Sequence, residues 1–183
     1  MTKDELRLKM RELRRNLSPD FICDASNEIT NKTLSFIGHP DVVMVYLSAF
    51  NEPDTLKIIN YLIKDNIKIV VPISNTEDYT LSLSYINDID NLKKGAYGIY
   101  EPITITHASV DEIDIALIPG IAFSKNGDRL GFGKGYYDKF LSDFKGIKIG
   151  LCYDFQICDE IPVSSHDIKM DAIITEKRIY NDF

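Results

Sequence analysis

Short runs of nonpolar residues, rich in β-branched side chains, recur along the chain from residue 42 onward. Such runs are typical of strands that are buried on both faces of a sheet. They occupy residues 42–48, 67–73, 113–119, 147–153 and, more briefly, 172–175. A further segment, residues 81–86, alternates nonpolar and polar positions, which predicts a more exposed strand at an edge or in a small antiparallel excursion.

Helical spacing of nonpolar residues marks the segments between and before these runs. Near the N-terminus the helical stripe consists of Leu6, Met10, Leu13 and Leu17. A second, basic stripe of the same helix is formed by Lys3, Arg7 and Arg14. Ser18 and Pro19 predict the start of a second helix that continues to about Gly38. Further helices are expected within residues 55–64 and 136–144.

This alternation of strands and helices predicts an α/β fold with a mostly parallel central sheet flanked by helices, a Rossmann-like three-layer sandwich. With 183 residues, of which 44% are hydrophobic, the chain is long enough to bury a core without disulfides or metals. Because no repeat or proline-rich linker interrupts it, we expect a single domain over residues 1–183.

Charge and composition narrow the classes of partner. The formal net charge of −7 argues against nonspecific binding to nucleic acid or to an anionic membrane. No nonpolar run approaches the roughly 20 residues that cross a bilayer. The three cysteines form no CxxC pair and the charged N-terminus does not look like a signal peptide, so we expect a cytoplasmic protein. We expect small-molecule partners and a monomer or weak dimer.

A glycine-rich segment, GDRLGFGKGYYD at residues 127–138, follows one of the predicted strands and leads into a predicted helix. In open α/β sheets, ligands bind where strands end and helices begin. Glycines at every second position from 131 to 135 allow backbone N–H groups to approach an anion, and Arg129 and Lys134 add positive charge. Asp138 follows one turn into the helix, where a carboxylate can hold Mg²⁺ beside a polyphosphate. The segment therefore predicts a phosphate-binding loop.

The common phosphate-binding motifs do not match this segment. A Walker A loop has Ser or Thr after its lysine, whereas Gly135 follows Lys134, and the dinucleotide fingerprint has glycine where Tyr136 stands. The alternative interpretation is that the glycines only make a tight turn.

Taken together, RLGFGKGYYD and the preceding PGIAF resemble the signature of the 5-formyltetrahydrofolate cyclo-ligase family. Further blocks resemble the same family in the same order: KDELR, YLSAFNEPDT, GAYGIYEP and HDIKMDAIITE. The resemblance covers nearly the whole chain. It implies a cyclisation of 5-formyltetrahydrofolate to 5,10-methenyltetrahydrofolate that uses ATP and Mg²⁺ and releases ADP and phosphate.

The resemblance also implies site residues. It assigns nucleotide binding to Lys3, Asp4, Glu5, Leu6, Arg7, Arg129, Leu130, Gly131, Phe132, Gly133, Lys134, Gly135, Tyr136 and Tyr137. It assigns folate binding to Leu47, Glu52, Phe132, Gly133, Lys134, Gly135 and Tyr136. Within these sets the expected catalytic residues are Arg129, Lys134 and Tyr136. Metal binding is assigned to Asp138 and Asp171. Position 132 is arginine in some members of the family and phenylalanine here.

Each assignment has a purely structural alternative. Lys3 and Arg7 also fit a solvated helix face, residues 52–55 a turn and helix cap, and Asp171 a charge at the start of a strand. His166 beside Asp167 suggests a dyad, but without a nucleophile we favour a structural role for it. For the whole chain the alternatives are a noncatalytic nucleotide- or folate-binding module and a sugar-phosphate enzyme.

Overall fold

The computed structural model describes residues 1–95, 98–164 and 167–181, and its centre is a seven-stranded sheet in the order β12-β11-β9-β6-β1-β2-β3. The five predicted nonpolar runs all lie in this sheet: β1 (Val42–Val45), β2 (Lys68–Asn75), β6 (Ile115–Pro119), β9 (Ile147–Leu151) and β11 (Ala172–Ile174). These five strands run parallel to one another. The prediction of a mostly parallel α/β sheet is confirmed.

Both outer strands of the sheet are antiparallel. β3 (Thr80–Ile86) pairs with β2, and β12 (Ile179–Tyr180) pairs with β11. The predicted edge strand at residues 81–86 is therefore confirmed. Its outer side is partly paired, because Tyr85 N–H donates to Thr106 O at 2.7 Å and Ala108 N–H donates to Leu83 O at 3.1 Å. These bonds occupy backbone groups that an edge strand otherwise exposes.

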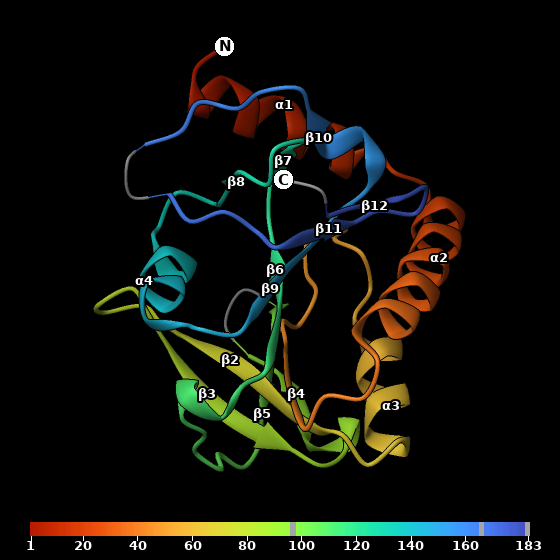
Figure 1. Ribbon diagram of the computed structural model, residues 1–183, viewed down its shortest axis with the longest axis vertical. Coiled ribbons are helices and arrows are strands. Elements are labelled where there is room, and N and C mark those ends of the chain that lie inside the picture. Colours follow the sequence, from red (N-terminus) through yellow and green to blue (C-terminus); the bar gives the residue numbers. More distant parts are fainter. Residues whose placement is uncertain (96–97, 165–166, 182–183) are drawn as a thin grey trace.

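The described residues form four α-helices: α1 (Lys3–Arg15), α2 (Pro19–Ile37), α3 (Leu56–Lys64) and α4 (Tyr136–Asp143). All four were predicted, and α2 starts as expected, with Pro19 in its first turn and Phe21 N–H donating to the Ser18 hydroxyl at 3.1 Å. Figure 1 shows α2 and α3 on one face of the sheet and α4 on the other. The three-layer arrangement is thus also confirmed.

The nonpolar runs are continuous because both faces of the sheet are covered. Along β1, Val43 and Val45 belong to the core formed with α2 and α3, whereas Val42 and Met44 belong to the core formed with α4. Side chains alternate between the two faces of a strand, so a strand covered on both sides needs nonpolar residues at every position.

Helix α1 packs on a smaller, three-stranded sheet at one end of the molecule (Figure 1). This sheet consists of β7 (Ala122–Ser124), β8 (Arg129–Leu130) and β10 (Ile157–Cys158), and Leu6 and Met10 are buried against it. The predicted loop at residues 127–138 thus includes a strand, β8, which forms a hairpin with β7. Strands of two or three residues are too short to show a periodic pattern.

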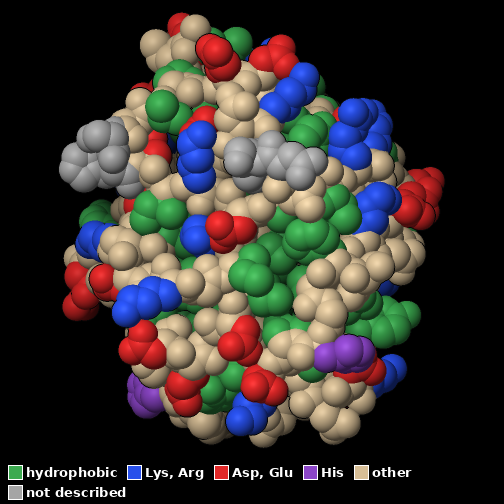
Figure 2. All heavy atoms as spheres, viewed as in Figure 1, with side chains coloured by type: hydrophobic (Ala, Val, Ile, Leu, Met, Phe, Trp, Pro, Cys, Tyr) green, Lys and Arg blue, Asp and Glu red, His purple; other side chains and the backbone are tan. Residues whose placement is uncertain are grey.

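The remaining elements are short. β4 (Leu92–Lys94) and β5 (Tyr100–Pro102) form a two-stranded sheet, and single 3₁₀ turns lie at η1 (Ile89–Asn91), η3 (Val110–Glu112) and η4 (Asp154–Gln156). Among the described helices, none combines the length and the nonpolar character that spanning a bilayer requires. On the face shown in Figure 2, acidic and basic side chains are interspersed, so the net charge of −7 is not concentrated there.

Candidate active site

A pocket of about 520 Å³ lies at the carboxyl ends of β1, β2 and β6, and we call it the carboxyl-end pocket. Its walls come from the segments that follow these strands and from the start of α4. They consist of Tyr46, Leu47, Ala49, Phe50, Glu52, Pro72, Ser74, Thr76, Tyr79, Ile99, Pro119, Arg129, Gly131, Phe132, Gly133, Lys134, Gly135, Tyr136, Tyr137 and Asp138. This is the edge of an open α/β sheet where ligands bind. The predicted folate residues and most of the glycine segment therefore share one pocket.

The glycine segment between β8 and α4 needs glycine at two positions. Gly133 has φ +96° and Gly135, the N-cap of α4, has φ +80°, which is backbone geometry that other residues rarely adopt. A Cβ atom on Gly133 would also lie 3.3 Å from Arg7 Cζ. Lys134 is exposed, with its Nζ 5.7 Å from the centroid of the Tyr79 ring, and Tyr79 makes an edge contact with Tyr136. The exposed lysine and the helix N-terminus thus lie at the same pocket wall.

Helix α1 contacts this segment through its basic side chains. Arg7 Nε donates to Gly131 O at 3.0 Å, and Arg11 Nη2 donates to Phe132 O at 3.3 Å. Asp4 pairs with Arg7 at 2.7 Å, and Glu5 caps the helix by accepting from Thr2 N–H. Of the five predicted nucleotide residues on α1, Arg7 and its partner Asp4 are therefore the ones tied to the glycine segment.

The two other predicted residues on α1 face different parts of the protein. Leu6 is buried against the small sheet, and its N–H donates to Thr2 O at 3.0 Å. Lys3 Nζ donates to Ser164 Oγ at 3.1 Å and to Asp167 Oδ2 at 2.9 Å. Lys3 thus joins the N-terminal helix to the segment before β11.

Asp167 is a charged neighbour of the site that sequence reasoning missed. Burial alone raises the pKa of this carboxyl, but hydrogen bonds from Lys3 and Ser164 N–H, with the charges of Lys3 and Arg129, bring it below its usual value. The sequence suggests only that Asp167 pairs with its neighbour His166, which lies outside the described residues. The only sequence signal for this segment is the resemblance of HDIKMDAIITE to the family. The contact of Asp167 with Lys3 leaves no local pattern, because the two residues are 164 positions apart.

Arg129 is a buried structural cation rather than an open one. Its side chain is only 3% exposed, Nη2 donates to Asp138 Oδ1 at 2.6 Å, and Nη1 donates to Pro119 O at 3.2 Å. Burial lowers the pKa of the guanidinium, and the Asp138 carboxylate opposes that effect. Arg129 nevertheless lines the carboxyl-end pocket, and its assignment to nucleotide binding stays a prediction. Leu130 beside it is also buried, against α1.

The two carboxylates predicted to bind metal lie at opposite ends of the parallel strands. Asp138 is bonded to Arg129, which reaches the end of β6 at Pro119. Asp171 precedes β11, accepts from Lys148 N–H at 2.7 Å and pairs with Lys148 Nζ at 2.8 Å. In the sheet, Pro119 is paired with Leu151, and Lys148 lies three positions before Leu151 on the same strand. The strand end near Asp138 and the strand start near Asp171 are therefore about 10 Å apart along the strands. These contacts place Asp138 and Asp171 at different levels of the sheet, and their assignment as metal ligands stays a prediction.

Glu52 is held by a turn between β1 and α3 in which Phe50 and Asn51 both have positive φ, +51° and +58°. The carboxylate accepts from Ala49 N–H at 2.9 Å, and Glu52 N–H donates to Ala49 O at 3.0 Å. Leu56 N–H donates to the Asp54 carboxylate at 2.9 Å, at the start of α3. Residues 52–55 therefore begin the helix and also direct Glu52 into the pocket, beside Leu47.

Glu52 forms an ion pair with Arg14, and both side chains are buried. Arg14 Nη1 lies 3.7 Å from Glu52 Oε1. Burial raises the pKa of Glu52 to about 7, although Arg14 and the Ala49 N–H lower it. As predicted, Arg14 shares a helix face with Arg7, but its side chain is buried, with only 3% exposed. The burial of Arg14 could be predicted from its spacing, because Arg14 continues the four-residue interval of Leu6 and Met10, which face the core.

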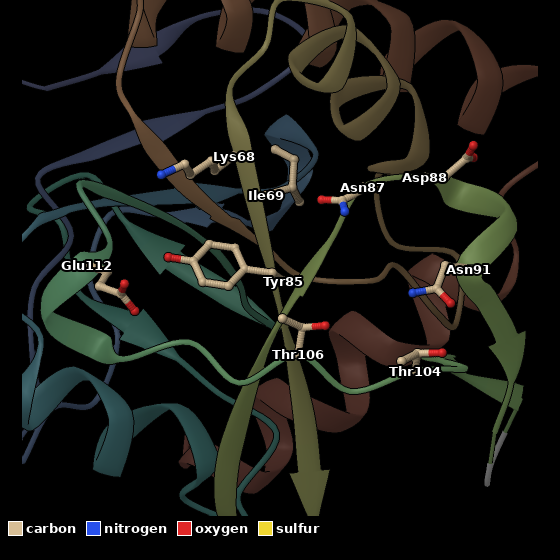
Figure 3. A pocket seen from close by; sticks show the side chains of 9 residues that line it. All are labelled: Lys68, Ile69, Tyr85, Asn87, Asp88, Asn91, Thr104, Thr106 and Glu112. Atoms are coloured by element: carbon tan, nitrogen blue, oxygen red, sulfur yellow. The ribbon is translucent and has the colours of Figure 1, made fainter.

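A second hollow, of about 600 Å³, lies near the amino end of β2, and we call it the amino-end hollow. Its walls consist of Lys68, Ile69, Tyr85, Asn87, Asp88, Asn91, Thr104, Thr106 and Glu112. Figure 3 shows these side chains spread over its length, with Tyr85 and Glu112 at one side and Asn91 and Thr104 at the other. Neither here nor elsewhere do the described residues contain a cluster of three or more His, Cys, Asp or Glu that could hold a metal ion.

The sequence matches the model of the 5-formyltetrahydrofolate cyclo-ligase family over residues 1–176. It is 29% identical to the 5-formyltetrahydrofolate cyclo-ligase of Haemophilus influenzae, with 94% of this chain and 96% of that protein aligned. It is 30% identical to the enzyme of the same name from Mus musculus, with 95% of this chain and 93% of that protein aligned. These relatives are thus matched over nearly their whole length.

Solved structures agree with the sequence comparisons. The 5,10-methenyltetrahydrofolate synthetase of Aquifex aeolicus superposes with a TM-score of 0.86 and 32% identity, covering 99% of this chain and 93% of that one. The synthetase of Mycoplasma pneumoniae superposes with a TM-score of 0.78 and 26% identity, covering 96% and 99%. Together with the pocket at the carboxyl ends of its strands, these matches show that the chain belongs to the 5-formyltetrahydrofolate cyclo-ligase family, a family of ligases.

Proposed function

We propose that this protein cyclises 5-formyltetrahydrofolate to 5,10-methenyltetrahydrofolate, using ATP and Mg²⁺ and releasing ADP and phosphate. The observation that carries the proposal is the carboxyl-end pocket, where the exposed Lys134 and the start of α4 share a cavity with the buried Glu52. One part of this cavity suits phosphates, and the other suits a planar molecule with hydrogen-bond donors.

The folate is proposed to lie on the Glu52 side of the pocket. A pterin ring carries N–H groups, and a carboxylate held in a partly nonpolar pocket accepts hydrogen bonds from such groups. Leu47 supplies a nonpolar surface, and Phe132 and Tyr136 supply aromatic ones. The nucleotide is proposed to lie on the side of Lys134, where Gly133 and Gly135 leave the backbone open to phosphate oxygens.

The chemistry requires activation of a formyl oxygen, which is a poor leaving group. In the proposed reaction that oxygen attacks the γ-phosphorus of ATP, its bond to phosphorus forms, and ADP leaves. N10 of the folate then attacks the formyl carbon and loses its proton, and the C–O bond breaks as phosphate departs. Such a reaction needs alignment and charge neutralisation more than a covalent nucleophile on the protein.

The charged residues divide these tasks. Lys134 is exposed in the pocket and is proposed to neutralise the phosphoryl group during transfer. Arg129 is buried against Asp138, so it acts as a positioning residue for that carboxylate. Tyr136 begins α4 beside the glycine segment and is proposed to contact the reacting groups. Arg7 braces the segment from α1 through Gly131 O.

The residues at the pocket fit a magnesium ion bound mainly by the nucleotide. One carboxylate oxygen of Asp138 accepts a hydrogen bond from Arg129. The Asp138 side chain is nevertheless 53% exposed, which leaves acceptor sites for a metal or for metal-bound water. Mg²⁺ is commonly held by one or two carboxylates together with substrate phosphates and waters. When bound, it would neutralise phosphate charge. Asp171 is not included in this site, for the geometric reason given above.

The direct test is to incubate the purified protein with ATP, Mg²⁺ and 5-formyltetrahydrofolate and to follow the methenyl chromophore together with ADP release. We expect both products in equal amounts, and neither when ATP or Mg²⁺ is omitted. Calorimetric binding of nucleotide and folate by folded protein without product would contradict the proposal and support a noncatalytic module instead.

A further inference from the structure

Residue Arg14 contacts both halves of the carboxyl-end pocket. Its guanidinium lies 3.7 Å from the Glu52 carboxylate, and its Cζ lies 5.7 Å from the centroid of the Phe132 ring. Its backbone carbonyl accepts from Asn51 Nδ2 at 3.0 Å. One residue near the end of α1 thus touches the turn that carries Glu52 and the segment that carries Lys134.

The face of α1 that carries Arg14 also binds the glycine segment through hydrogen bonds. Arg7, Arg11 and Arg14 recur every three or four residues, so they lie close together along the helix. Arg7 and Arg11 bind the carbonyls of Gly131 and Phe132, and Arg7 precedes Arg14 by two helical turns, about 10 Å. A shift of α1 at one contact is therefore transmitted to the other along a rigid helix.

The bonding of Arg14 is incomplete for a buried cation. Its Nε and Nη1 have no hydrogen-bond partner among the described residues, and 3.7 Å to Glu52 is longer than a hydrogen bond. A buried donor without a partner destabilises a fold, so such groups call for a functional explanation. A small movement of either element would convert the ion pair into a charged hydrogen bond, which is stronger.

We propose that Arg14 is a positioning residue that couples helix α1 and the glycine segment to Glu52, by holding the Glu52 carboxylate in the orientation that meets the folate. This inference rests on the proposed function. It adds a residue that does not itself line the pocket and that acts only through Glu52 and Phe132.

Several other groups face Glu52 and enter any test by pH. Tyr46 follows β1, Tyr137 lies on α4 and Tyr153 follows β9, and each interacts electrostatically with the Glu52 carboxylate. Burial raises the pKa of all three phenols, so they stay neutral where Glu52 titrates. Arg14 is the cation that lowers the pKa of Glu52, which burial raises to about 7. Its removal should raise that pKa further.

The test compares Arg14→Met and Arg14→Gln with Arg14→Lys and with Arg15→Met, which removes the same charge from the neighbouring exposed position. For the wild type we expect kcat/KM for formylfolate to rise with pH, with a midpoint near 7 as Glu52 ionises. The two neutral variants should move this midpoint up by about one pH unit and raise the KM for formylfolate at neutral pH about tenfold. Arg14→Lys should largely restore the midpoint, and Arg15→Met should match the wild type.

A second readout does not require turnover. An NMR titration of the Glu52 carboxyl, identified by its loss in Glu52→Gln, should show the same upward shift in the neutral variants. Two neutral variants are included so that the test survives if one fails to fold. An unchanged Glu52 midpoint, or equal rises in KM for ATP and formylfolate with no change in pH profile, would overturn the role of Arg14. Absence of methenyl product from the wild type would instead overturn the proposed function.

Discussion

The carboxyl-end pocket and the amino-end hollow have similar volumes, about 520 and 600 Å³, but their polar groups are used differently. In the amino-end hollow, Asp88 accepts from Asp90 N–H at the start of η1 and Glu112 accepts from Ser109 N–H at the start of η3. In the carboxyl-end pocket, Lys134 is exposed and Glu52 is buried with an incompletely bonded cation. Volume alone does not distinguish the two, whereas the burial of charged groups does: Glu52 is buried, but the charged residues of the amino-end hollow, Lys68, Asp88 and Glu112, are exposed.

The largest effect expected from this difference is in Lys134→Ala. Because Lys134 is the exposed cation of the glycine segment, its loss should lower kcat by about 100-fold or more, the scale seen when one charge-stabilising group is removed. Steady-state kinetics at saturating ATP measure this. Lys145→Ala, an exposed lysine just after α4, is the matched control and should stay close to the wild type. Equal kcat in both variants would remove Lys134 from the mechanism.

Glu52→Gln should change the pH dependence of stability. In the folded protein Glu52 keeps its proton up to about pH 7, whereas an ordinary glutamate releases it near 4.5. Between these values the native state binds the extra proton, so the wild type loses stability relative to the variant as pH rises. This difference in pKa between the folded and the unfolded protein corresponds to about 3 kcal/mol in the free energy of unfolding.

Urea denaturation of wild type and Glu52→Gln at a series of pH values measures this difference. Glu12→Gln, an exposed position on α1, serves as the control and should run parallel to the wild type. If the wild type and Glu52→Gln also ran parallel across this window, Glu52 would not be a perturbed carboxyl in the folded protein.

Asp138→Asn should have a smaller effect that appears mainly in the use of magnesium and nucleotide. The amide keeps the size of the side chain but loses the charge that pairs with Arg129 and that is proposed to meet Mg²⁺. We expect the Mg²⁺ concentration for half-maximal rate to rise about tenfold, the scale of one charged interaction. Asp143→Asn, at the exposed end of the same helix, is the control. A Mg²⁺ dependence that is identical in the two variants would argue against Asp138 as the metal residue.

The smallest effect is expected in the amino-end hollow. Asn87→Ala and Thr104→Ala remove polar groups from its wall, and we expect kcat and both KM values to stay within about twofold of the wild type, as for surface substitutions away from a site. The same kinetic assay measures this. A selective loss of activity in a folded variant would show that the two hollows are functionally connected and would weaken the distinction between them.

The sequence predicted the parallel strands, the edge strand and all four helices, because covered strands and amphipathic helices leave periodic patterns. It did not predict the β7–β8 hairpin, whose strands are too short for a period. It did not predict that Arg14 and Arg129 are buried or that Asp171 pairs with Lys148, because these contacts depend on tertiary packing. The glycine segment was predicted because its chemistry is local, whereas the Arg14–Glu52 pair depends on tertiary packing.

The contact of Lys3 with Asp167 joins residues 164 positions apart in the chain. Helix α1 also buries Leu6 and Met10 against a sheet built from segments after residue 120, including Ile161 nearby. During synthesis, therefore, the nonpolar stripe of α1 stays uncovered until the segments after residue 120 have emerged. Contacts so distant in sequence slow folding and leave such surfaces open to misassembly. Helix α1 thus precedes in the chain the small sheet on which its nonpolar stripe packs.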